Sequence, residues 1–181
     1  MSLSNLFGLF NRSGLTAVES MEARAGEGDA DAQFGLGLKL ATGEGMTKDY
    51  VLAVRWYLRA ALQSHRSAQF NLGTMYSDGH GVQVDKTESL LWFQKAADLG
   101  HPGAQHNVGI AHHHTSLSRM PRNASESRIE AYKWLQLASA QGLHESEIAC
   151  ELVIFQMTDE EVAEGHRRVT AFAVTEPVGQ V

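Results

Sequence analysis

Apolar residues recur along the chain at a helical spacing, and no stretch shows the strict alternation of a half-buried strand. One apolar stripe consists of Ala53, Trp56, Tyr57, Ala60 and Ala61. These positions fall at i, i+3, i+4, i+7 and i+8, which places them on one face of a helix. Residues 68–76 show a related spacing. The pattern predicts an all-α fold built from short amphipathic helices.

Two sequence strings return along the chain in a fixed order. The string Ala-Gln-x-x-x-Gly begins at Ala32 and returns twice with a step of 36 residues. A Trp-x-x-x-Ala string begins at Trp56, Trp92 and Trp134. Two kinds of helix therefore alternate, and a single pair cannot bury both of its faces, so the pairs must stack. We expect small residues such as Gly73 to let neighbouring helices approach closely.

Residues typical of helix ends separate these strings. Asp49 and Asp85 stand where a second helix should begin, and Pro102 suits the first position of a first helix. Gly-x-Gly pairs at Gly43 and Gly79 suit the reversal between two helices. We expect an N-terminal segment and capping helix at 1–28, three repeats at 29–142 (29–64, 65–100 and 101–142), and C-terminal capping helices with a tail at 143–181. A Thr158/Glu161 capping box should open the last helix.

With their glycine turns, these strings resemble the Sel-one-like repeat, a relative of the tetratricopeptide repeat, over residues 29–142. The resemblance implies an alpha-alpha superhelix, a right-handed solenoid of helix-turn-helix repeats whose first helices line a concave face. It also implies an adaptor or scaffold that binds a protein or peptide partner, as bacterial members do. The chain departs from the pattern at Gly35 and Leu40 in the first unit and at His112 in the third, which also lacks the Gly-x-Gly turn.

The related tetratricopeptide fold also implies which first-helix positions face the groove. Carried onto this chain, they are Phe34, Leu38, Phe70, Asn71, Thr74, His106, Asn107 and Ile110. Such an apolar ladder suits the anchors of a bound helix or extended peptide, and the asparagines suit hydrogen bonds to its backbone. The alternative is that the aromatic residues pack as core between successive first helices, and that the asparagines cap or bridge a neighbouring repeat.

Charge and composition narrow the partners. A net charge of −6 without a dense Lys/Arg run argues against nucleic acid. The apolar start, with Phe7 and Phe10, lacks the features of a signal peptide, and no later stretch has the length of a membrane-spanning helix. We expect a cytoplasmic protein, with a membrane-surface scaffold anchored by an amphipathic N-terminal helix as an alternative. The single cysteine, Cys150, rules out an intrachain disulfide.

Candidate chemistry is sparse. Three consecutive helical residues point about 100° apart, so the run His112 to His114 cannot converge on one metal ion. We expect His112 to take the place of a packing tyrosine and the other two histidines to fray into the next loop. We also expect His80 to lie in an exposed turn and Cys150 to be buried beside Ile148 and Leu152. No hydrolase or phosphate-binding motif stands out. We therefore expect no enzyme, cofactor or metal site, and keep a hydrolase on a repeat scaffold as an alternative.

The third unit carries an insertion at residues 115–127. It contains Arg119, Pro121 and Arg122, and predicts an exposed loop that is sensitive to proteolysis.

Overall fold

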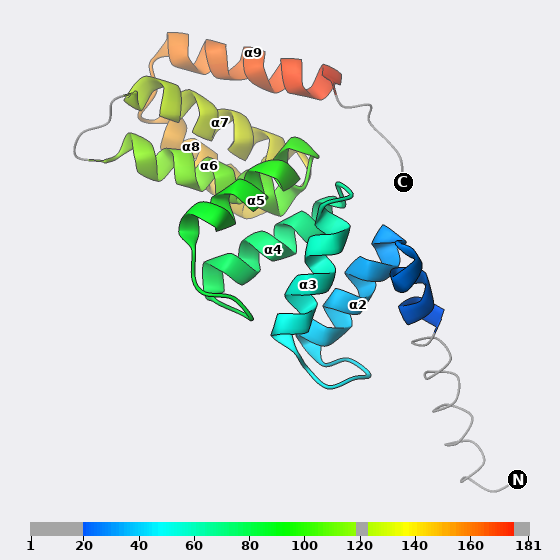
Figure 1. Cartoon of the computed structure of the whole chain (residues 1–181). Coiled ribbons are helices and arrows are strands. Elements are labelled where there is room, and N and C mark those ends of the chain that lie inside the picture. Colours follow the sequence, from blue (N-terminus) through cyan, green and yellow to red (C-terminus); the bar gives the residue numbers. More distant parts are fainter. Residues whose placement is uncertain (1–19, 119–122, 176–181) are drawn as a thin grey trace, which may run out of the picture. The chain divides into compact units, whose positions relative to one another are not determined.

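A computed structural model of the chain describes residues 20–118 and 123–175. The chain forms two compact units, Met1–Ser89 and Leu90–Val181. Helices and turns make up the whole of the described part, in which no strand is found (Figure 1). The predicted all-α repeat class is confirmed.

Unit 1 is built from successive antiparallel helices. Its elements are the helical residues 20–27, α2 (Ala30–Thr42), α3 (Tyr50–Ala61), α4 (Arg66–Asp78) and the start of α5 (Lys86–Asp98). Helix α3 contacts both α2 and α4. Buried alanines and aromatics such as Ala53 and Tyr57 form the shared core, as the apolar stripe predicts.

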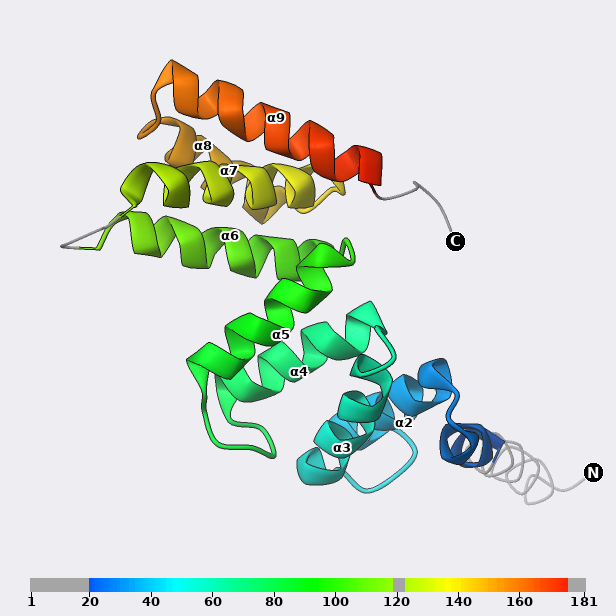
Figure 2. The ribbon, with the colours of Figure 1, turned by 45° about the horizontal axis from the view of Figure 1, so that its top comes forward.

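Unit 2 centres on one long helix. Its elements are the rest of α5, α6 (Pro102–Ser116), α7 (Ala124–Ala140), α8 (His144–Ile154) and α9 (Asp159–Thr175). Helix α7 contacts α6, α8 and α9, and the last of these lies along it (Figure 2). The core beside α8 includes Tyr132, Leu135, Cys150 and Val153.

The helix ends follow the predicted chemistry. The Asp49 carboxylate accepts a hydrogen bond from the Leu52 amide at 2.9 Å, and Gly43 ends α2 at a φ of 80°. Such a positive φ is strained for any residue with a Cβ. Before α9, the Thr158 amide donates to the Glu161 carboxylate at 3.1 Å, and the Glu161 amide donates to the Thr158 hydroxyl at 3.3 Å. This reciprocal pair is a complete capping box.

Glutamine side chains join each first helix to the helix before it. The Nε2 atoms of Gln33 and Gln69 each donate to a carbonyl eight residues earlier, at 3.1 Å in both cases, and Gln105 does the same at 3.3 Å. All three glutamines are buried, so these bonds give partners to side-chain N–H groups that are shielded from water. The recurrent glutamine therefore links each first helix to the preceding helix, and we call this bond the glutamine clasp.

Glycines in the first helices allow close helix packing. A Cβ built on Gly37 would lie 2.7 Å from the Tyr57 ring, and one on Gly109 would lie 2.7 Å from Leu135 Cγ. Ordinary contacts between carbon atoms are about 3.5–4.0 Å. The packing role predicted for the repeat glycine holds in both units.

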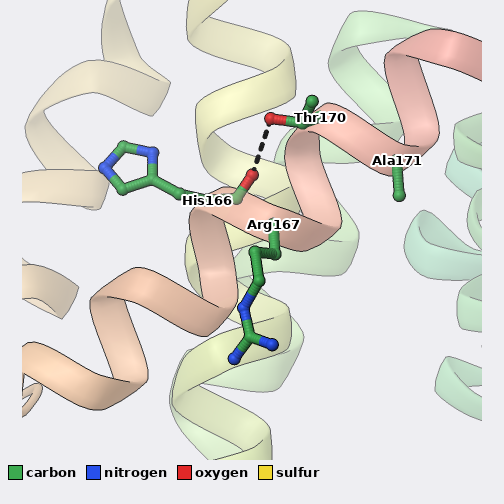
Figure 3. A pocket seen from close by; sticks show the side chains of 4 residues that line it. All are labelled: His166, Arg167, Thr170 and Ala171. Carbon is green, nitrogen blue, oxygen red and sulfur yellow. Dashed lines mark hydrogen bonds between the residues drawn. The ribbon is translucent and has the colours of Figure 1, made fainter.

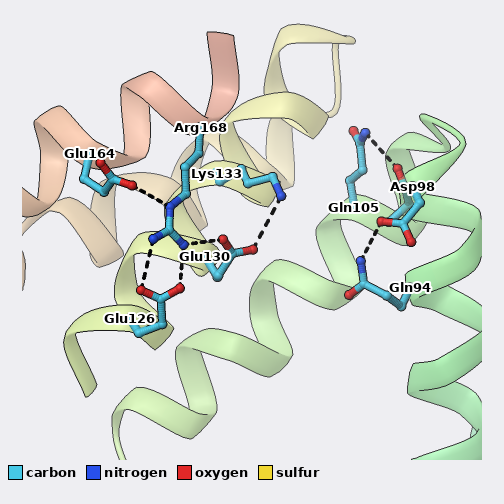
Figure 4. Close-up of polar contacts among 9 residues, drawn as sticks. Gln94, Asp98, Gln105, Glu126, Glu130, Lys133, Glu164 and Arg168 are labelled. Atoms are coloured by element: carbon cyan, nitrogen blue, oxygen red, sulfur yellow. Dashed lines mark hydrogen bonds and ion pairs between the residues drawn. The ribbon is translucent and has the colours of Figure 1, made fainter. Parts of the chain in front are cut away.

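An ionic cluster fastens α9 to α7. The Arg168 guanidinium binds Glu126 and Glu130 of α7, the latter at 2.6 Å, and Glu164 of its own helix at 2.8 Å (Figure 4). Nearer the start of α9, Arg128 donates twice to Glu161, at 2.6 and 3.0 Å. The C-terminal cap is thus held by paired charges as well as apolar contacts.

The insertion is shorter than predicted. Helix α6 continues to Ser116, so His113 and His114 are helical and do not fray as predicted, and α7 already begins at Ala124. The chain between Thr115 and Pro121 holds no glycine or proline that would end the helix earlier. Arg119, Pro121 and Arg122 lie outside the described residues.

Candidate functional site

In unit 1, Phe34 lies on α2 against residues of the next two helices. Its ring stacks on His65 at a centroid distance of 4.6 Å and lies 5.9 Å from Tyr57. His65 is held in turn, because its Nδ1 accepts from the Ala68 amide at 3.1 Å and its Nε2 lies 3.2 Å from an Asp31 oxygen. The half-buried Phe34 thus rests on a fixed ring at the start of α4.

Asn71 of α4 lies close to the Tyr57 hydroxyl of α3. Tyr57 is buried, and this burial raises the pKa of its phenol above the usual range. The buried Tyr57 ring supports the neighbouring Phe34 ring. Asn71 is half-buried and so is also in reach of solvent.

Of the remaining predicted residues of unit 1, Leu38 is exposed, while Phe70 and Thr74 are half-buried like Phe34 and Asn71. Leu38 lies one turn after Phe34 and is 41% exposed. On α4, Phe70 and Thr74 are half-buried and also one turn apart, and the Thr74 hydroxyl donates to the Phe70 carbonyl at 3.3 Å. Two successive first helices therefore each present an i, i+4 pair of predicted residues.

In unit 2 the corresponding residues are engaged by other elements. His106 Nδ1 lies 2.8 Å from the Ser146 hydroxyl of α8, and burial lowers the pKa of the imidazole. Ile110 packs against the core that α7 and α8 share. Asn107 is half-buried. Here α8 occupies the position that a following first helix would take.

Other chemistry-bearing groups do not converge. Among residues 20–118 and 123–175, no three His, Cys, Asp or Glu side chains are placed to hold one metal ion. Cys150 is buried as predicted, and this burial raises the pKa of its thiol to about 11, which keeps it protonated and unreactive. Its neighbours Ile148 and Leu152, however, are 65% and 58% exposed. His80 is an exposed turn residue, as predicted, and stacks on Tyr50.

A shallow hollow on α9 is lined by His166, Arg167, Thr170 and Ala171. The side chains of His166 and Arg167 point in different directions, and the Thr170 hydroxyl donates to the His166 carbonyl at 3.0 Å (Figure 3). No pair of these groups is arranged as an acid and a base, or as a nucleophile and its activator. The hollow contains none of the predicted partner-binding residues.

The geometry shows supporting residues that the sequence did not point out. His65 and Ser146 lie under Phe34 and His106 respectively, each at the start of the next first helix. For His65 the signal available was the recurrence of histidine at His65 and His101, 36 residues apart, just before the second and third Ala-Gln strings. Both histidines serve as N-caps.

Paired helices with packing glycines, glutamine clasps and a capped end define a helical repeat protein. The model of the Sel1 repeat family matches residues 30–65, 66–101 and 102–143, and the chain belongs to this family. Proteins of this family are in general protein-interaction scaffolds. Among the described residues, no helix is both long enough and apolar enough to cross a bilayer.

Solved structures support the same assignment. A Sel1 repeat protein from Oxalobacter formigenes is 30% identical, with a TM-score of 0.65 over 75% of this chain and 97% of that one. A protective antigen of uropathogenic Escherichia coli with the same kind of repeat is 21% identical, with a TM-score of 0.59 over 88% of this chain and 41% of that one, and this likeness shows the fold alone. No curated protein matched the chain.

Proposed function

We propose that this chain is a non-catalytic adaptor that binds a protein or peptide partner on the first helices of its repeats, with α2 and α4 as the principal surface. The observation that carries the proposal is the exposed Leu38 one helical turn after Phe34, whose ring packs against the buried Tyr57. An apolar side chain next to a supported aromatic ring is the usual form of an anchor pocket for a partner side chain. Phe70, Thr74 and Asn71 extend the same surface onto α4.

The chemistry of this surface indicates the kind of partner. Phe34, Leu38 and Phe70 favour apolar anchors spaced by one helical turn, while the Asn71 and Thr74 side chains offer hydrogen bonds. His106, Asn107 and Ile110 belong to the same proposal as a secondary contact, since α8 covers part of this region in unit 2. We place the adaptor in a bacterial cytoplasm, because it has a single cysteine and its 30% identical solved relative comes from a bacterium.

Peptides selected on the wild-type chain from a random library test the proposal without knowledge of the natural partner. Binding of fluorescent copies is then measured by anisotropy. Leu38→Glu should weaken binding at least about tenfold, because it places a charge in an apolar contact. Leu90→Glu on α5 is the matched control, since Leu90 is 40% exposed and Leu38 41%.

Two outcomes contradict the proposed surface. The first is a set of selected peptides that bind Leu38→Glu and wild type equally well. The second is a loss of binding in Leu90→Glu that matches the loss in Leu38→Glu. Circular dichroism of both variants shows whether the fold is retained.

A further inference from the structure

Helix α8 is apolar on two opposite faces. One face is buried in unit 2 and consists of Ser146, Ala149, Cys150 and Val153. The other consists of Ile148, Leu152 and Phe155, which are 65%, 58% and 92% exposed. A helix at the surface of a soluble protein usually has a single apolar stripe. The second stripe on α8 therefore indicates a contact with another surface.

Acidic residues surround this outer stripe of α8. Glu145, Glu147 and Glu151 are all exposed, and His144 is the only residue of α8 with a basic side chain. The outer face is thus an apolar strip in a negative field. Its complement is a helix that carries apolar side chains flanked by positive charges.

Helix α3 has this complementary composition. Its outer face carries Val51, Leu58 and Leu62 at the helix end, which are 51%, 40% and 71% exposed. At about 100° per residue these three positions and Arg55 fall within one narrow strip, on the side away from the buried Ala60. Arg59 lies beside the strip with its guanidinium over the Trp56 ring, 4.4 Å from the centroid. No acidic residue occurs between Tyr50 and Ala61.

The two strips also match in length. At about 1.5 Å per residue, the strip of α8 is about 11 Å long and that of α3 about 17 Å, so α3 is long enough to cover α8. From this match of charge, composition and length, we propose that the outer face of α3 in one copy of the chain docks on the outer face of α8 in a second copy.

Such a contact is heterologous, because the two copies contribute different surfaces. Each molecule then keeps one free α3 face and one free α8 face, so further copies can add. A contact between two helices of this length buries less accessible surface than a stable interface does, which is about 1,200–2,000 Å². The association is therefore weak, increases with concentration, and weakens with salt as the pairs of Arg55 and Arg59 with the glutamates are screened.

Sedimentation velocity of the full chain tests this proposal with two complementary variants. The first, Arg55→Glu/Leu62→Glu, blocks the α3 face and keeps α8. The second, Glu151→Lys/Leu152→Lys, blocks the α8 face and keeps α3. All four residues are exposed, so both variants should retain the helical circular dichroism of the wild type. The wild type should form species larger than a dimer as its concentration rises at low salt.

Each variant alone should remain a monomer. Mixed in equal amounts, the two should form a one-to-one dimer that does not grow, because only one intact α3 face and one intact α8 face meet. Leu90→Glu should associate like the wild type, and so should Leu38→Glu, which separates this contact from the proposed peptide surface. Both blocked variants should still bind the selected peptides.

Several results overturn the proposal. The proposal is wrong if the wild type stays monomeric at every concentration. It is also wrong if the mixture stays monomeric, or if a blocked variant still associates like the wild type. Loss of association in Leu6→Ala/Phe7→Ala would assign the α8 face to the apolar N-terminal segment instead. Association that does not weaken with salt would contradict the charge complementarity from which the pairing of α3 with α8 is argued.

Discussion

Substitution of Gly37 by alanine tests the link between helix packing and the proposed binding surface. Gly37 lies on α2 where this helix crosses α3, and an added Cβ would meet Tyr57 Cδ1 at 2.7 Å, Tyr57 Cε1 at 2.8 Å and the Ala53 carbonyl oxygen at 3.3 Å. Tyr57 cannot rotate freely, because it is buried and touches Phe34. Helices α2 and α3 must therefore move apart.

The magnitude follows from two opposing effects. Overpacking of a closely packed site costs about 1–3 kcal/mol, while alanine in place of glycine inside a helix gains about 1 kcal/mol. The expected result is a net loss of at most about 2 kcal/mol in the free energy of unfolding. Because the shift reaches Tyr57, which supports Phe34, we also expect weaker peptide binding.

Urea unfolding followed by circular dichroism measures the loss. Gly26→Ala is the matched control in the same unit, since Gly26 is helical and has no atom within 4 Å of an added Cβ. This control should gain about 0.5–1 kcal/mol and leave peptide binding unchanged. An unfolding midpoint for Gly37→Ala at or above that of the wild type would refute the close-packing argument.

Three further predictions concern pH and capping. Burial lowers the pKa of His106 and His112 below 6.5. Below about pH 7 the unfolded chain therefore binds more protons than the folded chain, and urea midpoints should fall as pH drops from about 7.5 to about 5.5. The double variant His106→Asn/His112→Tyr should reduce this dependence of the midpoint on pH. Hydrogen bonds from Arg128 lower the pKa of Glu161 to about 2, so its stabilisation is complete above about pH 5 and is lost as pH falls towards that pKa. Glu161→Gln should therefore cost about 1–2 kcal/mol near neutral pH and little near pH 2, measured by urea midpoints. His65→Ala should cost about 1 kcal/mol by loss of an N-cap, and His65→Ser should recover most of it in the same melts.

The fold was predictable because its main signal is periodic. The 36-residue step sets the pairing of helices, and caps such as Asp49 and Thr158 need only local geometry. The ends of α6 and α7 were not predictable in the same way. Histidine and serine neither require nor prevent helix, so whether residues 112–116 continue α6 depends on tertiary contacts, such as the one between His113 and Gln156.

The candidate site was only partly predictable. The family pattern implied which positions lie on the first helices, but exposure depends on the element that packs beside each of them. Cys150 shows the limit clearly, because its apolar neighbours Ile148 and Leu152 indicated burial of the whole stretch, yet α7 covers only the cysteine side. A helix with two apolar faces cannot be told from a fully buried helix by its sequence alone.

The two units show why equivalent positions on the ladder need not act equally. Phe34 and His106 stand three residues before a packing glycine, and each meets the first turn of the next first helix, at His65 and at Ser146. Both side chains are therefore partly used in holding successive helices together. The position one turn later differs, because Leu38 is open to solvent while Ile110 packs on the core beside α8. On the proposed surface we therefore expect a partner to contact Leu38 more than Ile110.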